Sequence, residues 1–133
     1  MNENEILIGV CGAHMSGLPL NWQLTDLEAT FVKKCKTKKG YRLFLLENKT
    51  PIRPGMIYDS SVKSQLELEV WSMKVENFGK FMKQIASPLG IGTVFLEDES
   101  SVYGFLCEAD YVKNSKEITS LGSWRNFLCQ QQQ

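Results

Sequence analysis

A change of hydrophobic period near the middle of the chain constrains the fold more than any other feature. Over 64–73, SQLELEVWSM, apolar and polar residues alternate, which predicts a half-solvated strand. Leu66, Leu68 and Val70 share one face, and the opposite face carries Glu67, Glu69 and Trp71. The following segment, 74–85, repeats its apolar residues at helical spacing: Val75, Phe78, Phe81, Met82 and Ile85. The chain is therefore expected to pack an amphipathic helix against a sheet.

Shorter patterns on either side add further strands. Residues 5–11, EILIGVC, form an apolar run that suits a strand buried on both faces. Residues 31–47 predict two strands joined as a hairpin through Lys38–Gly40, where glycine supplies a positive φ. Residues 93–96 and 101–107 predict another pair, linked by an acidic turn.

The remaining segments predict connections and short helices. The proline-bearing stretch 48–61 is expected to be a loop. A short helix can follow Asn21, and another can begin at about Ser123, which would cap it. The order of elements predicts an α+β fold with a compact, mostly antiparallel, barrel-like sheet and flanking helices.

Size and charge limit the classes of partner. A chain of 133 residues suits a single domain over 1–133, with a frayed tail at about 130–133. Fifteen basic and fifteen acidic residues cancel, so bulk charge predicts neither a nucleic-acid partner nor a membrane surface. The acidic start and the short apolar run after it predict no signal peptide and no membrane span, and hence a cytoplasmic protein.

The cysteines and the histidine content argue against a metal site. Four scattered cysteines form no CxxC pair, which favours reduced, mostly buried thiols over disulfides or zinc ligands: Cys11, Cys35, Cys107 and Cys129. The single histidine, His14, excludes a His-rich metal site. We therefore predict no metal and no cofactor.

The segment 9–21, GVCGAHMSGLPLN, is the strongest candidate for a functional loop. Its closely spaced glycines let the backbone approach a ligand, and exposed amides in such a turn can bind a carboxylate. The spacing matches neither the GxxxxGK[ST] nor the GxGxxG phosphate-binding pattern. His14 can be a ring hydrogen-bonded inside a turn or a proton donor and acceptor near neutral pH, and the residues alone leave both readings open.

A second glycine-bearing turn is expected at 87–92, SPLGIG. Two such turns at one end of a sheet could frame a small pocket, with Tyr41, Arg42 or Arg125 supplying polar contacts. A Ser-His-Asp triad built on Ser16 is disfavoured because the GxSxG elbow is missing.

Several motifs together resemble the C-terminal domain of allophanate hydrolase, in the same order and over nearly the whole chain. They are GAHMSGLPLNWQLT, YRLF, LEVWSM, PLGIGTVFLEDESSVYGFLCEA and ITSLGSWRNFL. The resemblance implies a gamma-glutamylcyclotransferase-like fold in which the His14 loop takes the place of that superfamily's ligand-binding turn. It also implies that His14 matches the histidine implicated in decarboxylating N-carboxycarbamate, the product of a separate amidase domain.

The resemblance also supplies the other candidate site residues. Gly12, Ala13, Ser16 and Gly17 flank His14 in the matching motif and are expected to bind the substrate. Five further residues lie in family-like motifs, and we assign them to substrate binding by inference: Tyr41, Arg42, Pro88, Gly90 and Gly92.

The sequence departs from the family pattern in two ways. The Ser-Ser-Lys amidase machinery is absent from this stretch, so the chain is expected not to hydrolyse an amide in the family's way. Trp22 stands where the family often has a second histidine. Cyclotransferase activity is discounted because Glu76, the nearest candidate for the catalytic glutamate of those relatives, sits in no acidic motif.

Three hypotheses for the activity can be tested. The first is a stand-alone enzyme that decarboxylates N-carboxycarbamate or an analogue through His14. The second is a non-catalytic module that binds a small carboxylate or serves a separately encoded amidase, and the third is a cyclotransferase that uses Glu67, Glu69 or Glu76. The candidate partners are a small carboxylate, that amidase and a second copy of the chain in a homodimer.

Overall fold

β1 (Glu5–Val10) lies at the centre of a five-stranded sheet in the computed structural model, which describes residues 4–131. The strand order is β2-β5-β1-β7-β6, with β1 antiparallel to β5 and parallel to β7. The flanking strands are β2 (Thr30–Lys36), β5 (Glu67–Lys74), β6 (Leu89–Phe95) and β7 (Ser101–Cys107). All other pairs are antiparallel, which confirms the predicted α+β class and sheet type.

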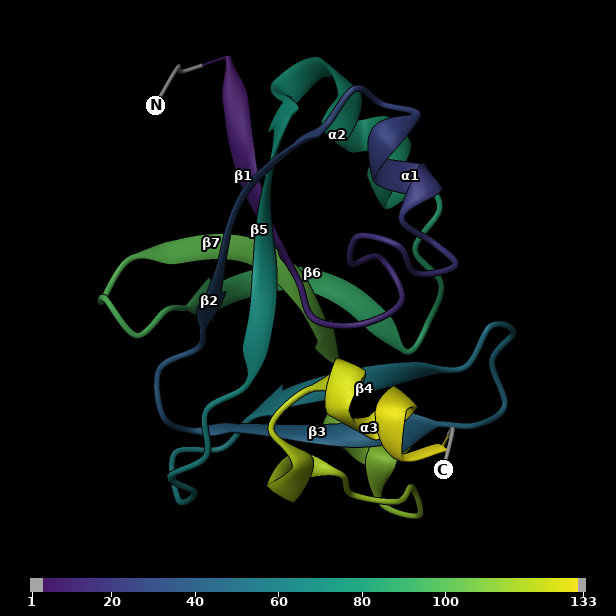
Figure 1. Ribbon diagram of the computed structural model, residues 1–133, viewed down its shortest axis with the longest axis vertical. Coiled ribbons are helices and arrows are strands. Elements are labelled where there is room, and N and C mark those ends of the chain that lie inside the picture. Colours follow the sequence, from purple (N-terminus) through teal and green to yellow (C-terminus); the bar gives the residue numbers. More distant parts are fainter. Residues whose placement is uncertain (1–3, 132–133) are drawn as a thin grey trace.

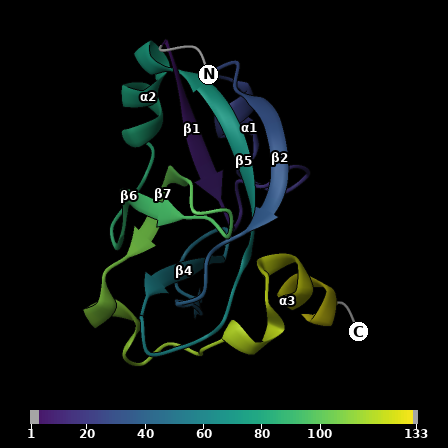
Figure 2. The same ribbon diagram turned by 90° about the vertical axis from the view of Figure 1, so that its left-hand side faces the viewer.

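A separate ribbon of two antiparallel strands, β3 (Tyr41–Leu46) and β4 (Arg53–Tyr58), completes the β-structure. The α-helices are α1 (Trp22–Thr25), α2 (Val75–Met82) and α3 (Trp124–Gln131), and two 3-10 turns, η1 (Ala109–Val112) and η2 (Thr119–Leu121), lie before α3. Figures 1 and 2 show α1 and α2 at one end of the molecule and the β3–β4 ribbon with α3 at the other. No helix among the described residues is long and apolar enough to cross a membrane.

The five-stranded sheet curls until its two edges meet at one end. The Lys38 amide donates to the Phe95 carbonyl at 2.9 Å, and the Glu97 amide donates to the Lys36 carbonyl at 3.1 Å. Thr37 and Leu96 form the bridge between these two bonds. The sheet is thus barrel-like at this end, while β2 and β6 do not pair along their length.

Two predicted connections are wrong. β2 and β3 do not form a hairpin, because β2 pairs with β5 and β3 pairs with β4. The physical reason is burial: β3 is buried along nearly its whole length and needs cover on both faces, whereas β2 is an exposed edge strand. The segment predicted to be a loop contains β4, because a proline, Pro54, is tolerated in a ribbon of only two strands.

The strand and helix at the change of period are both present, with one correction. Leu66, Leu68 and Val70 are fully buried as predicted. Glu69 and Trp71 are only 4% and 6% exposed, so the opposite face of β5 is buried at these two positions, while Glu67 stays partly exposed. The loop that carries His14 covers Glu69 through Ser16, and helix α3 covers it through Arg125.

The other local predictions hold in outline. β6 and β7 form the predicted antiparallel pair, but β6 begins at Leu89, so the expected glycine turn at 87–92 is largely strand. Helix α3 begins after Ser123, whose hydroxyl accepts the Asn126 amide at 3.0 Å. The four cysteines are free thiols, of which Cys11 and Cys107 are buried, Cys35 is half-buried and Cys129 is exposed.

Candidate functional site

The loop after β1 folds back on itself and fixes the position of His14. The Met15 amide donates to the Gly12 carbonyl at 3.0 Å, and the Leu20 amide donates to the Ala13 carbonyl at 2.9 Å. Asn21 closes the loop from the start of α1, where its side-chain amide donates to the His14 carbonyl at 2.8 Å. Gly12 cannot be replaced by a larger residue, because an added Cβ would lie 2.5 Å from the Pro54 ring.

The His14 side chain is buried among aromatic rings. It is 7% exposed and contacts the ring of Phe81 edge-on, at a centroid distance of 5.5 Å, and the ring of Phe105 at 4.9 Å. Its Nε2 lies 2.6 Å from Oε1 of Gln23 on α1. Burial lowers the pKa of His14 to about 4, although the hydrogen bond to Gln23 acts in the opposite direction. His14 is therefore neutral at pH 7.

The second ring nitrogen of His14, Nδ1, is left without a partner among the described residues. Within 4–131, every buried side-chain nitrogen or oxygen has a hydrogen-bond partner. The ring's one hydrogen bond is made by Nε2, so Nδ1 makes none to any residue in this range. Nδ1 is therefore not sealed in the core, and His14 lines a small cavity.

This cavity lies between the His14 loop, β4 and the sheet. Its volume is about 20 Å³, and its lining includes Gly12, Ala13, His14, Arg53 and Phe105. About 10–15 Å³ of such space is enough to hold one water molecule, so the cavity has room for about one water and not for a dicarboxylate. A substrate can bind only if the lining moves apart.

Arg53 is the charged residue of this cavity. Its guanidinium donates to the carbonyls of Pro51 and Thr50, each at 3.1 Å. It forms no ion pair with any residue in the described part of the chain. Its charge contributes to lowering the pKa of His14. A positive charge without a carboxylate partner beside a neutral imidazole favours the binding of an anion.

Glu69 anchors the other side of the loop. One carboxylate oxygen accepts the Ser16 amide at 2.8 Å and the Trp71 indole at 3.1 Å, and the other accepts the Ser16 hydroxyl at 2.9 Å. Arg125 on α3 donates to Glu69 at 2.9 Å and to the Ser16 carbonyl at 2.7 Å. Burial raises the pKa of Glu69, but these hydrogen bonds outweigh it and hold the pKa below its ordinary value.

One known protein family matches nearly the whole of this chain. The model of the allophanate hydrolase C-terminal domain matches residues 6–129. The chain belongs to this family. It is 42% identical over 129 residues to the urea amidolyase of Saccharomyces cerevisiae, which covers 93% of this chain and 7% of that protein.

Solved structures agree with the assignment. Kluyveromyces lactis allophanate hydrolase superposes with a TM-score of 0.91 at 35% identity, over 96% of this chain and 21% of that one. A uropathogenic E. coli-specific protein, c4763, superposes with a TM-score of 0.87 at 31% identity, over 97% and 98% of the two chains. An uncharacterized protein from Pyrococcus horikoshii, with a TM-score of 0.74 at 20% identity, shares the fold. The predicted α+β fold of the allophanate hydrolase C-terminal domain is confirmed.

The residues of the family motif around His14 lie in two different environments. Gly12 and Ala13 line the cavity with His14. Ser16 and Gly17 are exposed and do not line it, and the amide and hydroxyl of Ser16 are engaged by Glu69. Trp22, the family departure, is 51% exposed and lies outside the cavity lining. Trp22 therefore does not contribute to the lining of the cavity.

The other predicted binding residues do not join His14. Tyr41 is buried, and its hydroxyl accepts the Phe95 amide at 3.0 Å. Arg42 donates hydrogen bonds to the carboxylates of Glu117 and Asp59. Pro88 and Gly90 line a separate hollow of about 330 Å³ that shares only Leu89 with the His14 cavity. Gly92 lies in β6 opposite Gly104.

The sequence reasoning missed two residues of the site. Gln23 lies on the same short segment as Asn21, and no residue pattern marked it as a partner of His14. Arg53 lies in the segment that was predicted to be a loop, and loops often carry binding residues. A basic residue between two prolines was the available signal.

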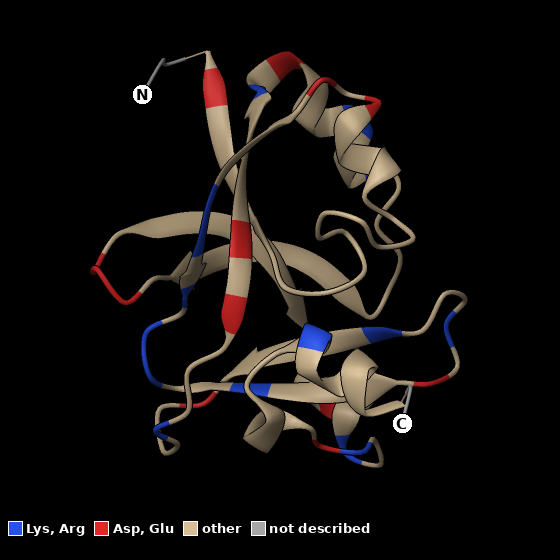
Figure 3. Cartoon of the chain, in the orientation of Figure 1, with Lys and Arg blue, Asp and Glu red and all other residues tan. Residues whose placement is uncertain are grey.

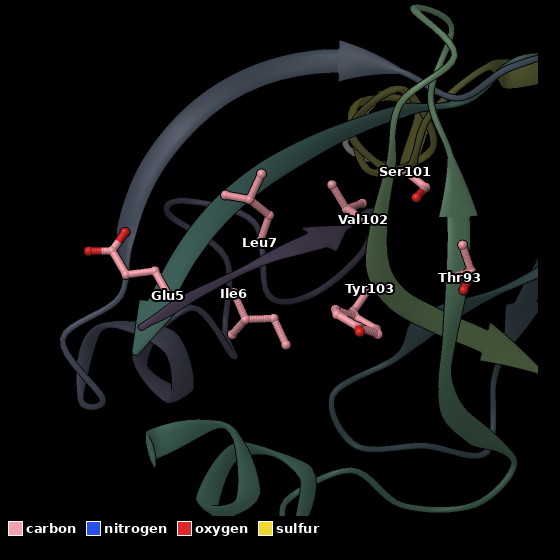
Figure 4. Close-up of a pocket in the computed structure, with 7 residues that line it drawn as sticks. All are labelled: Glu5, Ile6, Leu7, Thr93, Ser101, Val102 and Tyr103. Atoms are coloured by element: carbon pink, nitrogen blue, oxygen red, sulfur yellow. The ribbon is translucent and has the colours of Figure 1, made fainter. Parts of the chain in front are cut away.

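A larger hollow of about 270 Å³ lies where β1 and β7 diverge beyond their pairing at Ile8 and Gly9 (Figure 4). Glu5, whose carboxylate accepts the Ser72 hydroxyl at 2.6 Å, is its only charged residue. The hollow is lined by Glu5, Ile6, Leu7, Thr93, Ser101, Val102 and Tyr103. It offers no cation or histidine, and it lacks the anion-binding chemistry of the His14 cavity. No group of acidic, histidine and cysteine side chains among the described residues is arranged to hold a metal ion.

Proposed function

We propose that this domain binds a small dicarboxylated nitrogen compound at His14 and promotes its decarboxylation, with N-carboxycarbamate or a close analogue as substrate. The observation that carries the proposal is the pairing, in one cavity, of a neutral histidine that has a free ring nitrogen with an arginine that has no counterion. Family membership supports a place in allophanate and urea degradation.

Binding of the dianion would use the loop and β4 together. Arg53 attracts one carboxylate. The backbone amides of Ala13 and His14 donate to no other group in residues 4–131 and are free to hold the other. Two negative charges close to His14 favour its protonated form, so the imidazole takes up a proton from solvent when the ligand binds.

The chemical step then balances within the site. The bond between nitrogen and one carboxyl carbon breaks, carbon dioxide leaves, and the electron pair of that bond stays on nitrogen. Nδ1 of His14 donates its proton to this nitrogen, which yields carbamate and returns His14 to its neutral form. Positioned acid catalysis of this kind typically contributes about 10²- to 10⁴-fold in rate.

The test follows N-carboxycarbamate released from allophanate by an added amidase, by ¹³C NMR. The wild-type domain should accelerate its loss, and His14→Asn should reduce the acceleration by about 100-fold or more. Gly17→Ala is not a suitable control because Gly17 has a φ of 80°. Trp22→Leu, at an exposed position outside the cavity, serves instead and should retain the acceleration. Equal acceleration by wild type and His14→Asn would overturn the catalytic role.

A second candidate is a non-catalytic module that binds a small carboxylate for a separate amidase. The relatives named urea amidolyase carry the matching region as 7% of a much longer chain, which supports an amidase as partner. Under this alternative, malonate binds at His14 but the domain alone does not change the lifetime of N-carboxycarbamate.

A further inference from the structure

We infer that Gln23 is a positioning residue that holds His14 in the tautomer with its proton on Nε2, so that Nδ1 is the atom that meets the ligand. The inference deepens the proposed function and rests on it for its catalytic meaning. The tautomer itself can be measured without any substrate.

Two contacts from neighbouring residues of the α1 segment fix the histidine. Asn21 holds the His14 backbone carbonyl, and Gln23 holds the ring through the 2.6 Å contact between Oε1 and Nε2. The segment is itself anchored by Leu24, which is fully buried. Phe81 and Phe105 pack against the ring and restrict its rotation. The imidazole therefore has one orientation toward the cavity.

The chemistry of the amide decides the tautomer. A carbonyl oxygen only accepts hydrogen bonds, so the nitrogen that contacts Oε1 must carry a proton. A neutral imidazole has one N–H, and Nδ1 is left with a lone pair. At rest the cavity thus presents an acceptor, and Nδ1 becomes a donor only after a ligand dianion has favoured protonation.

A glutamine suits this task better than a glutamate would. Its neutral amide keeps the ring oriented in both protonation states without stabilising the imidazolium by a charge. The other titratable groups lining the cavity are Arg53 and Cys11, and burial raises the pKa of Cys11 to about 12, so its thiol stays neutral. Without a carboxylate in that lining, His14 can return to its neutral form once its proton has been delivered.

The chain offers a direct test because it contains one histidine, so its ring signals need no assignment among several residues. In ¹⁵N-labelled wild type at pH 7, Nε2 should resonate in the protonated range and Nδ1 in the unprotonated range. Gln23→Leu should move both signals toward the average of the two tautomers. Gln23→Glu should keep the proton on Nε2 and raise the pKa of His14, and it should slow decarboxylation by about tenfold because the proton is held.

Trp22→Leu is the matched control on the same helix and should leave both ring signals unchanged, since Trp22 is exposed and outside the cavity lining. Circular dichroism checks that each variant is folded. A wild-type proton on Nδ1, or unchanged ring signals in folded Gln23→Leu, would overturn the inference. If the wild-type domain shows the expected tautomer but does not accelerate decarboxylation, the proposed function is wrong and the inference about Gln23 stands.

Discussion

The β3–β4 ribbon carries an arginine near each of its ends, where the chain is blue in Figure 3. The two arginines have opposite surroundings. Arg42 on β3 makes two parallel hydrogen bonds to Glu117, at 3.0 and 2.7 Å, and a third to Asp59 at 3.2 Å. Within the described part of the chain, Arg53 on β4 donates hydrogen bonds to backbone carbonyls only. The hydrogen bond and charge of Glu117 raise the pKa of Arg42 above its ordinary value, whereas burial lowers the pKa of Arg53.

This difference separates a structural charge from one available to a ligand. A guanidinium forked onto a carboxylate is satisfied and holds two segments of chain together. A guanidinium that is partly desolvated and lacks a counterion gains most from an incoming anion. The residue pattern indicated Arg42 as a ligand-binding residue, and the structure favours Arg53 for that role.

The largest expected effect concerns His14, which lines the same cavity as Arg53. Its titration should change the stability of the fold at acid pH. Burial lowers the pKa of His14 from 6.5 to about 4, so between these values the unfolded chain binds more protons than the folded one. Stability should therefore fall as the pH falls through this window, by about 3 kcal/mol in all. Urea unfolding of wild type and His14→Gln at pH 7 and pH 4.5 measures it.

His14→Gln should lose most of this dependence. The carboxylates around Arg42 give a contrast, because hydrogen bonds hold the pKa of Glu117 and of Asp59 below their ordinary values. Their contribution is present above those ordinary values and is lost only at lower pH. An identical pH profile in the two proteins between pH 7 and pH 4.5 would contradict the assignment to His14.

The next effect concerns ligand binding and compares the two arginines directly. Arg53→Met should weaken binding of malonate, a stable dianion, by about 100-fold, which corresponds to about 2.7 kcal/mol. Arg42→Met should leave malonate affinity unchanged and lower the free energy of unfolding by about 1 kcal/mol. Isothermal titration calorimetry and urea unfolding of the same samples measure both. Equal losses of affinity would remove the distinction between the two arginines.

A smaller effect is expected at Glu69, whose charge is buried and, unlike that of Arg53, paired. Glu69→Gln should destabilise the domain by about 2 kcal/mol, because Arg125 and Ser16 lose the carboxylate that holds them. Glu67→Gln is the matched change two residues earlier on β5. Glu67 is more exposed and lies 3.7 Å from Lys34, so its loss should cost about 0.5 kcal/mol or less. Urea unfolding at pH 7 compares the two variants, and equal costs would mean that Glu69 is not a structural anchor.

Local sequence patterns were sufficient where the forces are local. The alternation over 64–73 and the helical spacing after it depend on residues close together in the chain, and β5 and α2 follow them. The Ser123 cap is equally local, since it satisfies an amide three residues away. The family motif around His14 likewise marked the loop that carries the candidate site.

Tertiary structure alone decided which residues meet at that loop. Arg53 lines the same cavity as His14 because β4 packs against the loop after β1, and no residue period encodes this arrangement of residues 39 positions apart. Glu69 follows an alternation that predicts solvent, but the His14 loop and α3 cover it and supply its hydrogen bonds. Periodicity reports which side of an element a residue occupies, while burial and ion pairing depend on what the rest of the chain places against that side.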